Sequence, residues 1–302
     1  MSTVFSLPKD WLDLQIMEET TRGTFEAPGA PTNAIFVAQT PELDWTYDLN
    51  LAVNKVTGSR DPAHVLATMP DLRFSMMIPN MVSPETINFL KRGFNLEAGA
   101  GTIERLFSGC LRTKLGATQY YLKMKGLIIG AGAIQLLGQG PWTVPALWMM
   151  GKLHGWDTSA PTNWTFVTPP TTVPLMSKDA GANHVTIRDL ETSTDYTPSV
   201  RGLSIGFNNS LFPIPQTGVS EYADIIPTER AIQVRYVLNM KDLSIFNILK
   251  LMHEAKSTIV IKSATHTVTV DGGKLSPARI PVVTDTPITE AYVHVGKVGS
   301  LV

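Results

Sequence analysis

Two short segments early in the chain carry the alternation of apolar and polar residues that is typical of a half-buried β-strand. The first covers residues 43–51 and the second covers residues 72–78. Both patterns recur 160 residues further along, at 203–211 and 232–238, where only Leu49 meets a polar counterpart. The sequence therefore predicts two pairs of strands at a fixed offset, as expected of an internal repeat.

Each pair of strands is expected to enclose a long connection and to lead into a helix. The connections, residues 52–71 and 212–231, have equal lengths and are expected to be loops. Loops this long inside a compact domain usually have a function. Ser83 can cap the first helix and Asp242 the second, at a helix offset of 159. The buried face of the first helix is expected to carry Ile87, Leu90 and Phe94.

The last strands of the two copies match at a smaller offset. Residues 146–152 match residues 291–297 at an offset of 145, so the first copy carries 14 residues more than the second, expected around 93–118. Before its last strand the second copy should form strands at 258–262 and 266–270, with Asp271-Gly272-Gly273 as a turn.

These matches predict a chain that is mainly β with one helix per repeat, a β+α fold written twice. An N-terminal arm is expected at residues 1–33, a first domain at 34–155 and a second at 156–302. The boundary follows from the concentration of Gly, Asp, Ser and Pro near residues 154–161.

The overall composition narrows the class of protein. The formal net charge is −1, from 25 basic and 26 acidic residues, which is unlike a protein that binds nucleic acid by neutralising phosphates. Hydrophobic residues make up 43% and charged residues 17%, which favours a surface that is partly covered by other subunits. With Cys110 as its one cysteine and no secretory signal, the chain is expected to stay soluble inside a cell.

The sequence shows no complete motif for catalysis, cofactor binding or metal binding. The six histidines lack metal-ligand spacing, and the glycine-rich runs at 130–132 and 138–140 complete no nucleotide-binding fingerprint. Residues 218–222 lack the final glycine of a nucleophile elbow. We therefore expect no enzyme, no cofactor and no metal. An apolar cluster is expected either in the core or at a subunit contact, at Trp142, Trp148, Met149 and Met150.

Two features resemble a known family. Residues 19–24 (Glu-Thr-Thr-Arg-Gly-Thr) resemble the opening of many major tail tube proteins of long-tailed, siphovirus-type bacteriophages, although they also suit an ordinary turn-rich arm. The repeat unit of early strands, long connection and single helix is similar to a tail tube domain. The whole chain resembles the subset of the family that carries two tube domains in tandem.

The resemblance implies two tail-tube-like β-barrel or sandwich domains and a structural role. Three chains would form a ring of six domains, a homotrimer with pseudo-sixfold symmetry, and stacked rings would form the conduit for DNA ejection. The expected partners are further copies, other tail proteins and passing double-stranded DNA that is not specifically bound, with no membrane. The expected location is the virion tail, and the host cytoplasm during assembly.

The resemblance also suggests two sets of site residues. The polar side of the first strand is the candidate lumen face, made of Asp44, Thr46, Asp48 and Asn50. The two long connections are candidates for contacts between rings, through Lys55, Arg60, Asp61, Glu221, Tyr222 and Asp224. Two other functions stay open, another virion component of the neck or terminator, and a non-phage two-domain β-rich binding protein.

Overall fold

The described part of the chain is mainly β. The computed structural model describes residues 13–25, 36–39, 43–48, 51–55, 62–67, 71–81, 84–96, 105–115, 117–162, 164, 166, 174–197, 200–216, 222–239, 257–275, 289–296 and 298–301. Within them the strands of the N-terminal half are β1 (Asp13–Glu18), β2 (Phe36–Gln39), β3 (Leu43–Asp48), β4 (Leu51–Lys55), β5 (Pro62–Ala67), β6 (Asp71–Ile78), β7 (Phe107–Leu115), β8 (Thr118–Leu137) and β9 (Trp142–Asp157). Those of the C-terminal half are β10 (Val185–Asp189), β11 (Asp195–Tyr196), β12 (Val200–Ile214), β13 (Asp224–Asn239), β14 (Ser257–Lys262), β15 (Thr267–Leu275), β16 (Thr289–Gly296) and β17 (Val298–Leu301). The helices are α1 (Pro84–Gly93) and the short 3-10 helix η3 (Ser177–Asn183).

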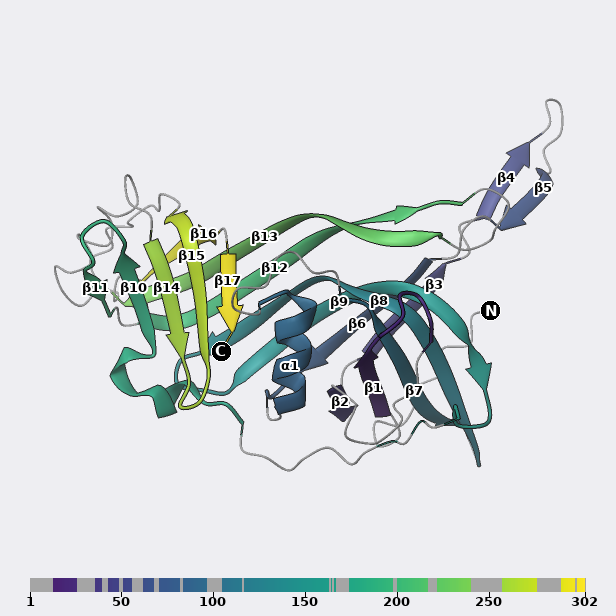
Figure 1. The fold of residues 1–302 in the computed structure, drawn as a ribbon, viewed down its shortest axis with the longest axis horizontal. Helices are drawn as coiled ribbons and strands as arrows, with labels where there is room; N and C mark the ends of the chain where they lie inside the picture. Colours follow the sequence, from purple (N-terminus) through teal and green to yellow (C-terminus); the bar gives the residue numbers. More distant parts are fainter. Residues whose placement is uncertain are drawn as a thin grey trace.

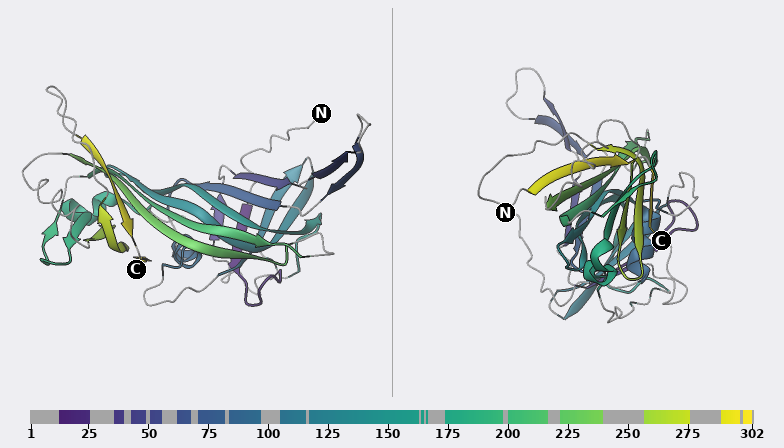
Figure 2. Two further views of the ribbon diagram at one scale, coloured as in Figure 1. Left: turned by 90° about the horizontal axis from the view of Figure 1, so that it is seen from above. Right: turned by 90° about the vertical axis from the view of Figure 1, so that its left-hand side faces the viewer.

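One antiparallel sheet of 15 strands joins both halves of the chain, and β4 and β5 form a separate hairpin. The sheet is long and arched, with β12 and β13 running along its length (Figures 1 and 2). The mainly β prediction is therefore confirmed. Among the described residues no helix is long and apolar enough to cross a membrane.

The two halves of the sheet have the same strand order. In the N-terminal half the neighbours run β2, β1, β7, β8, β9, β6, β3. In the C-terminal half they run β11, β10, β14, β15, β16, β13, β12. When the seven strands of each half are numbered in chain order, strands with the same number occupy the same position in the two sheet orders. We call these two sets the first half and the second half.

Strand register also matches between the halves. Leu43 pairs with Met76, and after a one-residue shift Leu51 pairs with Ala67. Adding 160 to these numbers gives pairs found between β12 and β13, Leu203 with Tyr236 and Leu211 with Pro227, on either side of a bulge. The pair Leu72 with Gly151 becomes Ile232 with Gly296 when the offsets of 160 and 145 are added. Offsets read from sequence therefore reproduce the pairing of three strands.

The first helix lies where the sequence predicts it. Ile87 and Leu90 of α1 are buried, and so is Phe94 directly after it, as the apolar spacing indicates. Phe94 stacks on Phe207 of β12 with ring centroids 4.4 Å apart, so the residue that follows α1 contacts the second half. The cap residue Ser83 and the second helix expected from Asp242 lie outside the described residues.

The prediction that residues 52–71 and 212–231 are loops is wrong over much of their length. β4 and β5 occupy 51–55 and 62–67, and β12 and β13 continue as paired strands to Ile214 and from Asp224. Each connection is the end of an extended hairpin, because backbone groups there pair across the two arms. Irregular side-chain alternation hid these strands, since Pro227 and the bulge before Leu211 interrupt the period of two.

The turn expected at Asp271-Gly272-Gly273 is also wrong. These residues lie inside β15, where Asp271 pairs with Val298 and Gly273 pairs with Ser257. The chain turns earlier, at residues 263–266, where the Ser263 amide donates to the carbonyl of His266 at 2.8 Å. A Gly-rich run fits a strand here because neighbouring strands on both sides supply its hydrogen-bond partners.

The strand β1 adds a feature that sequence reasoning missed. Six of its residues pair with β7, so part of the expected N-terminal arm is a strand of the first half. Its alternating Leu14 and Ile16 are fully buried. In the expected apolar cluster Trp142 and Met149 are fully buried, Met150 is nearly so, and Trp148 is partly buried.

Candidate functional site: the junction between the two halves

The long strand β8 joins the two halves. Residues 131–137 of β8 pair with residues 202–208 of β12, while earlier residues of β8 pair with β7. β9 runs along the other edge of β8. The second half is therefore attached to the first by a continuous ladder of backbone hydrogen bonds, and the end of the β12–β13 hairpin extends over the first half (Figure 1).

The turn after β1 is fixed by the carboxylate of Glu19. One oxygen accepts hydrogen bonds from the Gly126 amide at 2.6 Å and the Ser108 hydroxyl at 3.1 Å, and the other accepts from the Gly23 amide at 2.7 Å. Gly23 has φ +70°, a left-handed conformation that suits glycine. This carboxylate, a strong acceptor of charge-assisted hydrogen bonds, ties the turn to β7 and β8.

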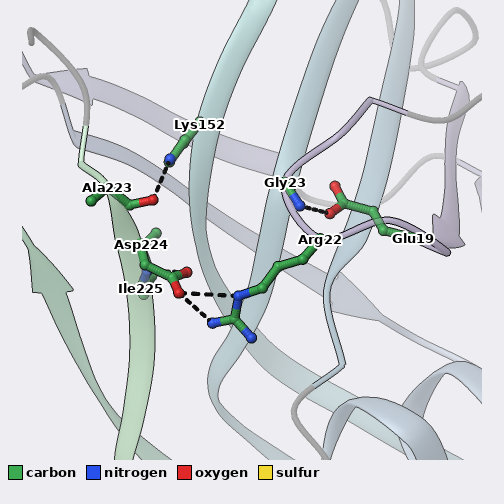
Figure 3. A network of polar contacts seen from close by, with 7 residues as sticks. All are labelled: Glu19, Arg22, Gly23, Lys152, Ala223, Asp224 and Ile225. Atoms are coloured by element: carbon green, nitrogen blue, oxygen red, sulfur yellow. Dashed lines mark hydrogen bonds and ion pairs between the residues drawn. The ribbon is translucent and has the colours of Figure 1, made fainter.

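The same turn reaches the second half through Arg22. Its Nε and Nη2 donate to one carboxylate oxygen of Asp224, at 3.0 and 2.7 Å (Figure 3). Nearby, the ammonium group of Lys152 on β9 donates to the carbonyl of Ala223 at 3.1 Å. The hairpin end thus contacts the first half at two adjacent points by polar groups.

An apolar cluster lies beneath these polar contacts. Ile225 of β13 is 2% exposed and belongs to a buried cluster with Leu106, Ile128 and Met150 of the first half. Trp148, Leu211 and Tyr222 pack against this cluster and are partly buried. A hollow of about 180 Å³ lies beside it, lined by Arg22, Gly23, Leu106, Gly126, Lys152, Ala223, Asp224 and Ile225. The junction combines backbone pairing, apolar burial and an ion pair, as a stable interface does.

The first half has an edge in the place where the second half has this junction. β3 corresponds to β12, but within the described residues β3 pairs with β6 alone. The hairpin β4–β5 corresponds to the end of the β12–β13 hairpin, and it projects away from the body of the molecule in all three views (Figures 1 and 2). An exposed strand edge is a template for pairing with another chain.

The structure separates the predicted site residues. On β3, Asp44 pairs with Ser75, Thr46 pairs with Arg73 and Asp48 pairs with Asp71. Arg73 is exposed and Ser75 is intermediate, while Phe74 between them on β6 is buried. The backbone register therefore aligns the candidate lumen residues with the unburied side of β6.

The candidates for contacts between rings fall into two groups. Lys55 pairs with Pro62 at the β4–β5 hairpin, whereas Tyr222 and Asp224 lie at the junction and contact the first half of their own chain. The other candidates for contacts between rings, Arg60, Asp61 and Glu221, lie outside the described residues, as does Asn50 of the candidate lumen face.

Sequence reasoning found part of the junction and missed part. Residues 19–24 were singled out for their family resemblance, and Arg22 within them makes the ion pair. Ser108, Gly126 and Lys152 carry no local signal, because their roles arise from contacts made across the sheet. Among the described residues, no group of three or more His, Cys, Asp or Glu side chains is placed to hold a metal ion.

No protein-family model matches the chain, and no curated protein sequence matches it.

Proposed function

We propose that this chain is the structural subunit of a bacteriophage tail tube, which polymerises as stacked rings of three chains to form the conduit for DNA ejection. In this proposal the chain contains two tandem tube domains, and neither has a catalytic role. The observation that carries it is the repetition of strand order and register in the two halves.

The repeat supports an assembly function because the two halves leave different edges. The β12 edge is paired with β8 inside the chain, while the corresponding β3 edge is unpaired among the described residues. A contact between two different surfaces is heterologous, and repeating it gives a closed ring or an open filament. Closing the ring would give the β3 edge of each chain a partner, which removes the risk of uncontrolled pairing at that edge.

The opening motif adds support from the sequence. Residues 19–24 resemble the opening of tail tube proteins, and in this chain they form the turn that holds the junction through Glu19 and Arg22. A role in fixing neighbouring tube domains gives these residues a physical reason to be present. The near-zero net charge of −1 also suits a channel that lets DNA pass without binding it.

Electron microscopy of the purified full-length chain tests the proposal. Rings, or hollow tubes with a repeating axial step, are expected, and sedimentation velocity should show a species of three chains under conditions that prevent stacking. A protein that stays monomeric up to millimolar concentration, with neither rings nor tubes on the grid, would contradict the function.

The lumen face can be tested separately. We propose that Asp44 and Asp48 repel the phosphate backbone, so the double variant D44K/D48K should slow DNA ejection from virions that carry it. The matched control D179K/E191K makes the same charge change at two exposed residues outside the strands. Equal ejection rates for the two variants would rule out a lumen role for β3.

A further inference from the structure

The internal junction shows how a hairpin of this fold docks on a neighbouring half. The edge of β12 pairs with β8, and the hairpin end lies across β8 and β9 with Ile225 buried beside Met150. Lys152 donates to the carbonyl of Ala223 at its margin. All of these contacts join neighbouring strands of one sheet, so the second long connection binds beside the first half of its own chain.

The first hairpin has the same construction without an intrachain partner in the described residues. β3 and β6 pair in the register of β12 and β13, and β4 and β5 continue it after the equivalent one-residue shift. Figures 1 and 2 show the β4–β5 hairpin extending into space away from both halves. A docking element is therefore present in the first half, and among the described residues of the chain no strand of the second half pairs with it.

We propose that the β3 edge and the β4–β5 hairpin dock on the second half of another copy of this chain, over β15 and β16, as β12 and β13 dock over β8 and β9 within it. This inference rests on the proposed function for the existence of a ring, and it names the surface on which the first hairpin of each chain docks. It assigns the first long connection to contacts between neighbours within a ring and not to contacts between stacked rings.

The residues at equivalent positions support this docking. On the hairpin, Leu211 and Ile225 correspond to Leu51 and Val65 at the offset of 160. On the receiving side, Trp148 and Met150 correspond to Val293 and Val295 at the offset of 145. All four counterparts are apolar, so the apolar contact can recur between chains.

The polar contact of Lys152 is also repeated in sequence. Ala223 corresponds to Ala63, and Lys152 corresponds to Lys297, so the same residue types stand at both ends of the equivalent contact. Ala63 lies in β5, and Lys297 lies outside the described residues. The acceptor in this contact is a backbone carbonyl, which any residue at position 63 would supply, so the repeated feature that matters is the lysine.

Two features of the internal junction are not repeated, the ion pair and one apolar residue. Asp224 corresponds to His64 at the same offset, so the carboxylate that binds Arg22 has no counterpart on β5. Ile128 pairs with Met150, and Lys274 pairs with Val295, the residue equivalent to Met150. Lys274 therefore stands where the internal junction has the apolar Ile128. The joint between chains therefore lacks the ion pair of the internal junction, and raising the salt concentration should not dissociate it.

Cysteine cross-linking of the full chain tests the docking. The double variant A63C/K297C, treated with a short bis-maleimide, should give covalent products of two and three chains on a denaturing gel. The variant K152C/A223C is the matched control, since its cysteines replace a contact within one chain and should link intramolecularly without raising the mass. The single variants A63C and K297C show the background from random collision.

The native cysteine does not interfere with this experiment. Cys110 is fully buried, and burial raises the pKa of its thiol to about 12, so little reactive thiolate is present near neutral pH. Absence of intermolecular products from A63C/K297C above the single-variant background, while K152C/A223C links internally, would overturn the inference.

A further comparison separates the inference from the proposed function. Rings or tubes without A63C/K297C cross-links would leave the tail tube function standing and contradict this docking. Cross-linked chains without any ring or tube would support the docking and contradict the function. Deleting residues 52–66 should give monomers if the hairpin acts within a ring, and soluble rings from this deletion would again contradict the docking.

Discussion

Arg22 and Asp224 are joined by two hydrogen bonds to one carboxylate oxygen, although 202 residues separate them in the chain. Arg22 belongs to the turn after the first strand of the first half, and Asp224 begins β13 of the second half. The pair is the polar margin of a junction whose interior is apolar. The distance between Arg22 and Asp224 therefore indicates whether the two halves are docked.

We expect the Arg22–Asp224 pair to contribute little to global stability. The side chains are 43% and 33% exposed, and exposed pairs typically contribute about 0.2–1 kcal/mol. A double-mutant cycle with R22A and D224A, followed by urea unfolding, should give a coupling free energy in that range that falls in 1 M salt. The cycle R188A/D195A, at a pair 3.7 Å apart within the second half, is the control. A coupling several times larger would show that the pair organises the junction.

Glu19 should matter more than the ion pair. The variant E19A leaves the amides of Gly23 and Gly126 without their acceptor, which is expected to lower the free energy of unfolding by about 1–3 kcal/mol. E19Q keeps one carbonyl acceptor and should fall between E19A and the unmodified chain. The control E229A removes an exposed glutamate and should change stability by less than about 0.5 kcal/mol. Equal effects of E19A and E229A in urea unfolding would contradict the assignment.

Gly132 is required where β8 passes beneath α1. A methyl group at this position would lie 2.6 Å from the ring of Phe94 and 2.8 Å from Leu147, so G132A should destabilise the chain by about 1–3 kcal/mol through overpacking. G202A is the matched control, because its nearest atoms would lie at 3.7 Å or more and the substitution should be close to neutral. Thermal unfolding of both variants measures the difference. A tolerated G132A would mean that α1 can move away from the sheet.

Acid should weaken the turn between β10 and β11 through Asp189. The hydrogen bond from the Thr192 hydroxyl, at 2.6 Å, is the main cause that lowers the pKa of this carboxyl below its ordinary value. A lowered pKa in the folded state stabilises the chain above the unfolded-state pKa, and this contribution is lost as pH falls through the folded-state pKa. T192V should raise the pKa of Asp189 and flatten that acid dependence, measured by NMR titration and by urea unfolding. T228V, which removes an exposed hydroxyl on β13, is the control. An unchanged pKa in T192V would contradict the stated cause.

Local periodicity in the sequence was sufficient for several elements. The alternation at 43–48 and 72–78 identified β3 and β6, and helical spacing identified the buried face of α1. The offsets of 160 and 145 reproduce the pairs of β13 with its neighbours. These features are readable because burial on one face of a strand or helix imposes a pattern on consecutive residues.

Long-range pairing could not be read from consecutive residues. Residues 212–231 lack the pattern of a strand, yet residues 224–231 pair with β12 and Ile225 is buried against the first half. Residues 271–273 carry a turn signal, yet β14 and β17 draw them into a strand. In both places the hydrogen-bond partners come from elsewhere in the chain, and they override the local preference.

The sequence alone determined that the chain is mainly β, that its strand pattern recurs at a fixed offset, and which residues form the faces of β6 and α1. Only the tertiary structure decided that Glu19, Arg22 and Asp224 meet at one junction, and that the β12 edge is paired while the β3 edge lies open among the described residues. The reason is that periodicity records which face of an element is buried, whereas the choice of neighbouring strand depends on packing and backbone hydrogen bonds summed over the whole sheet.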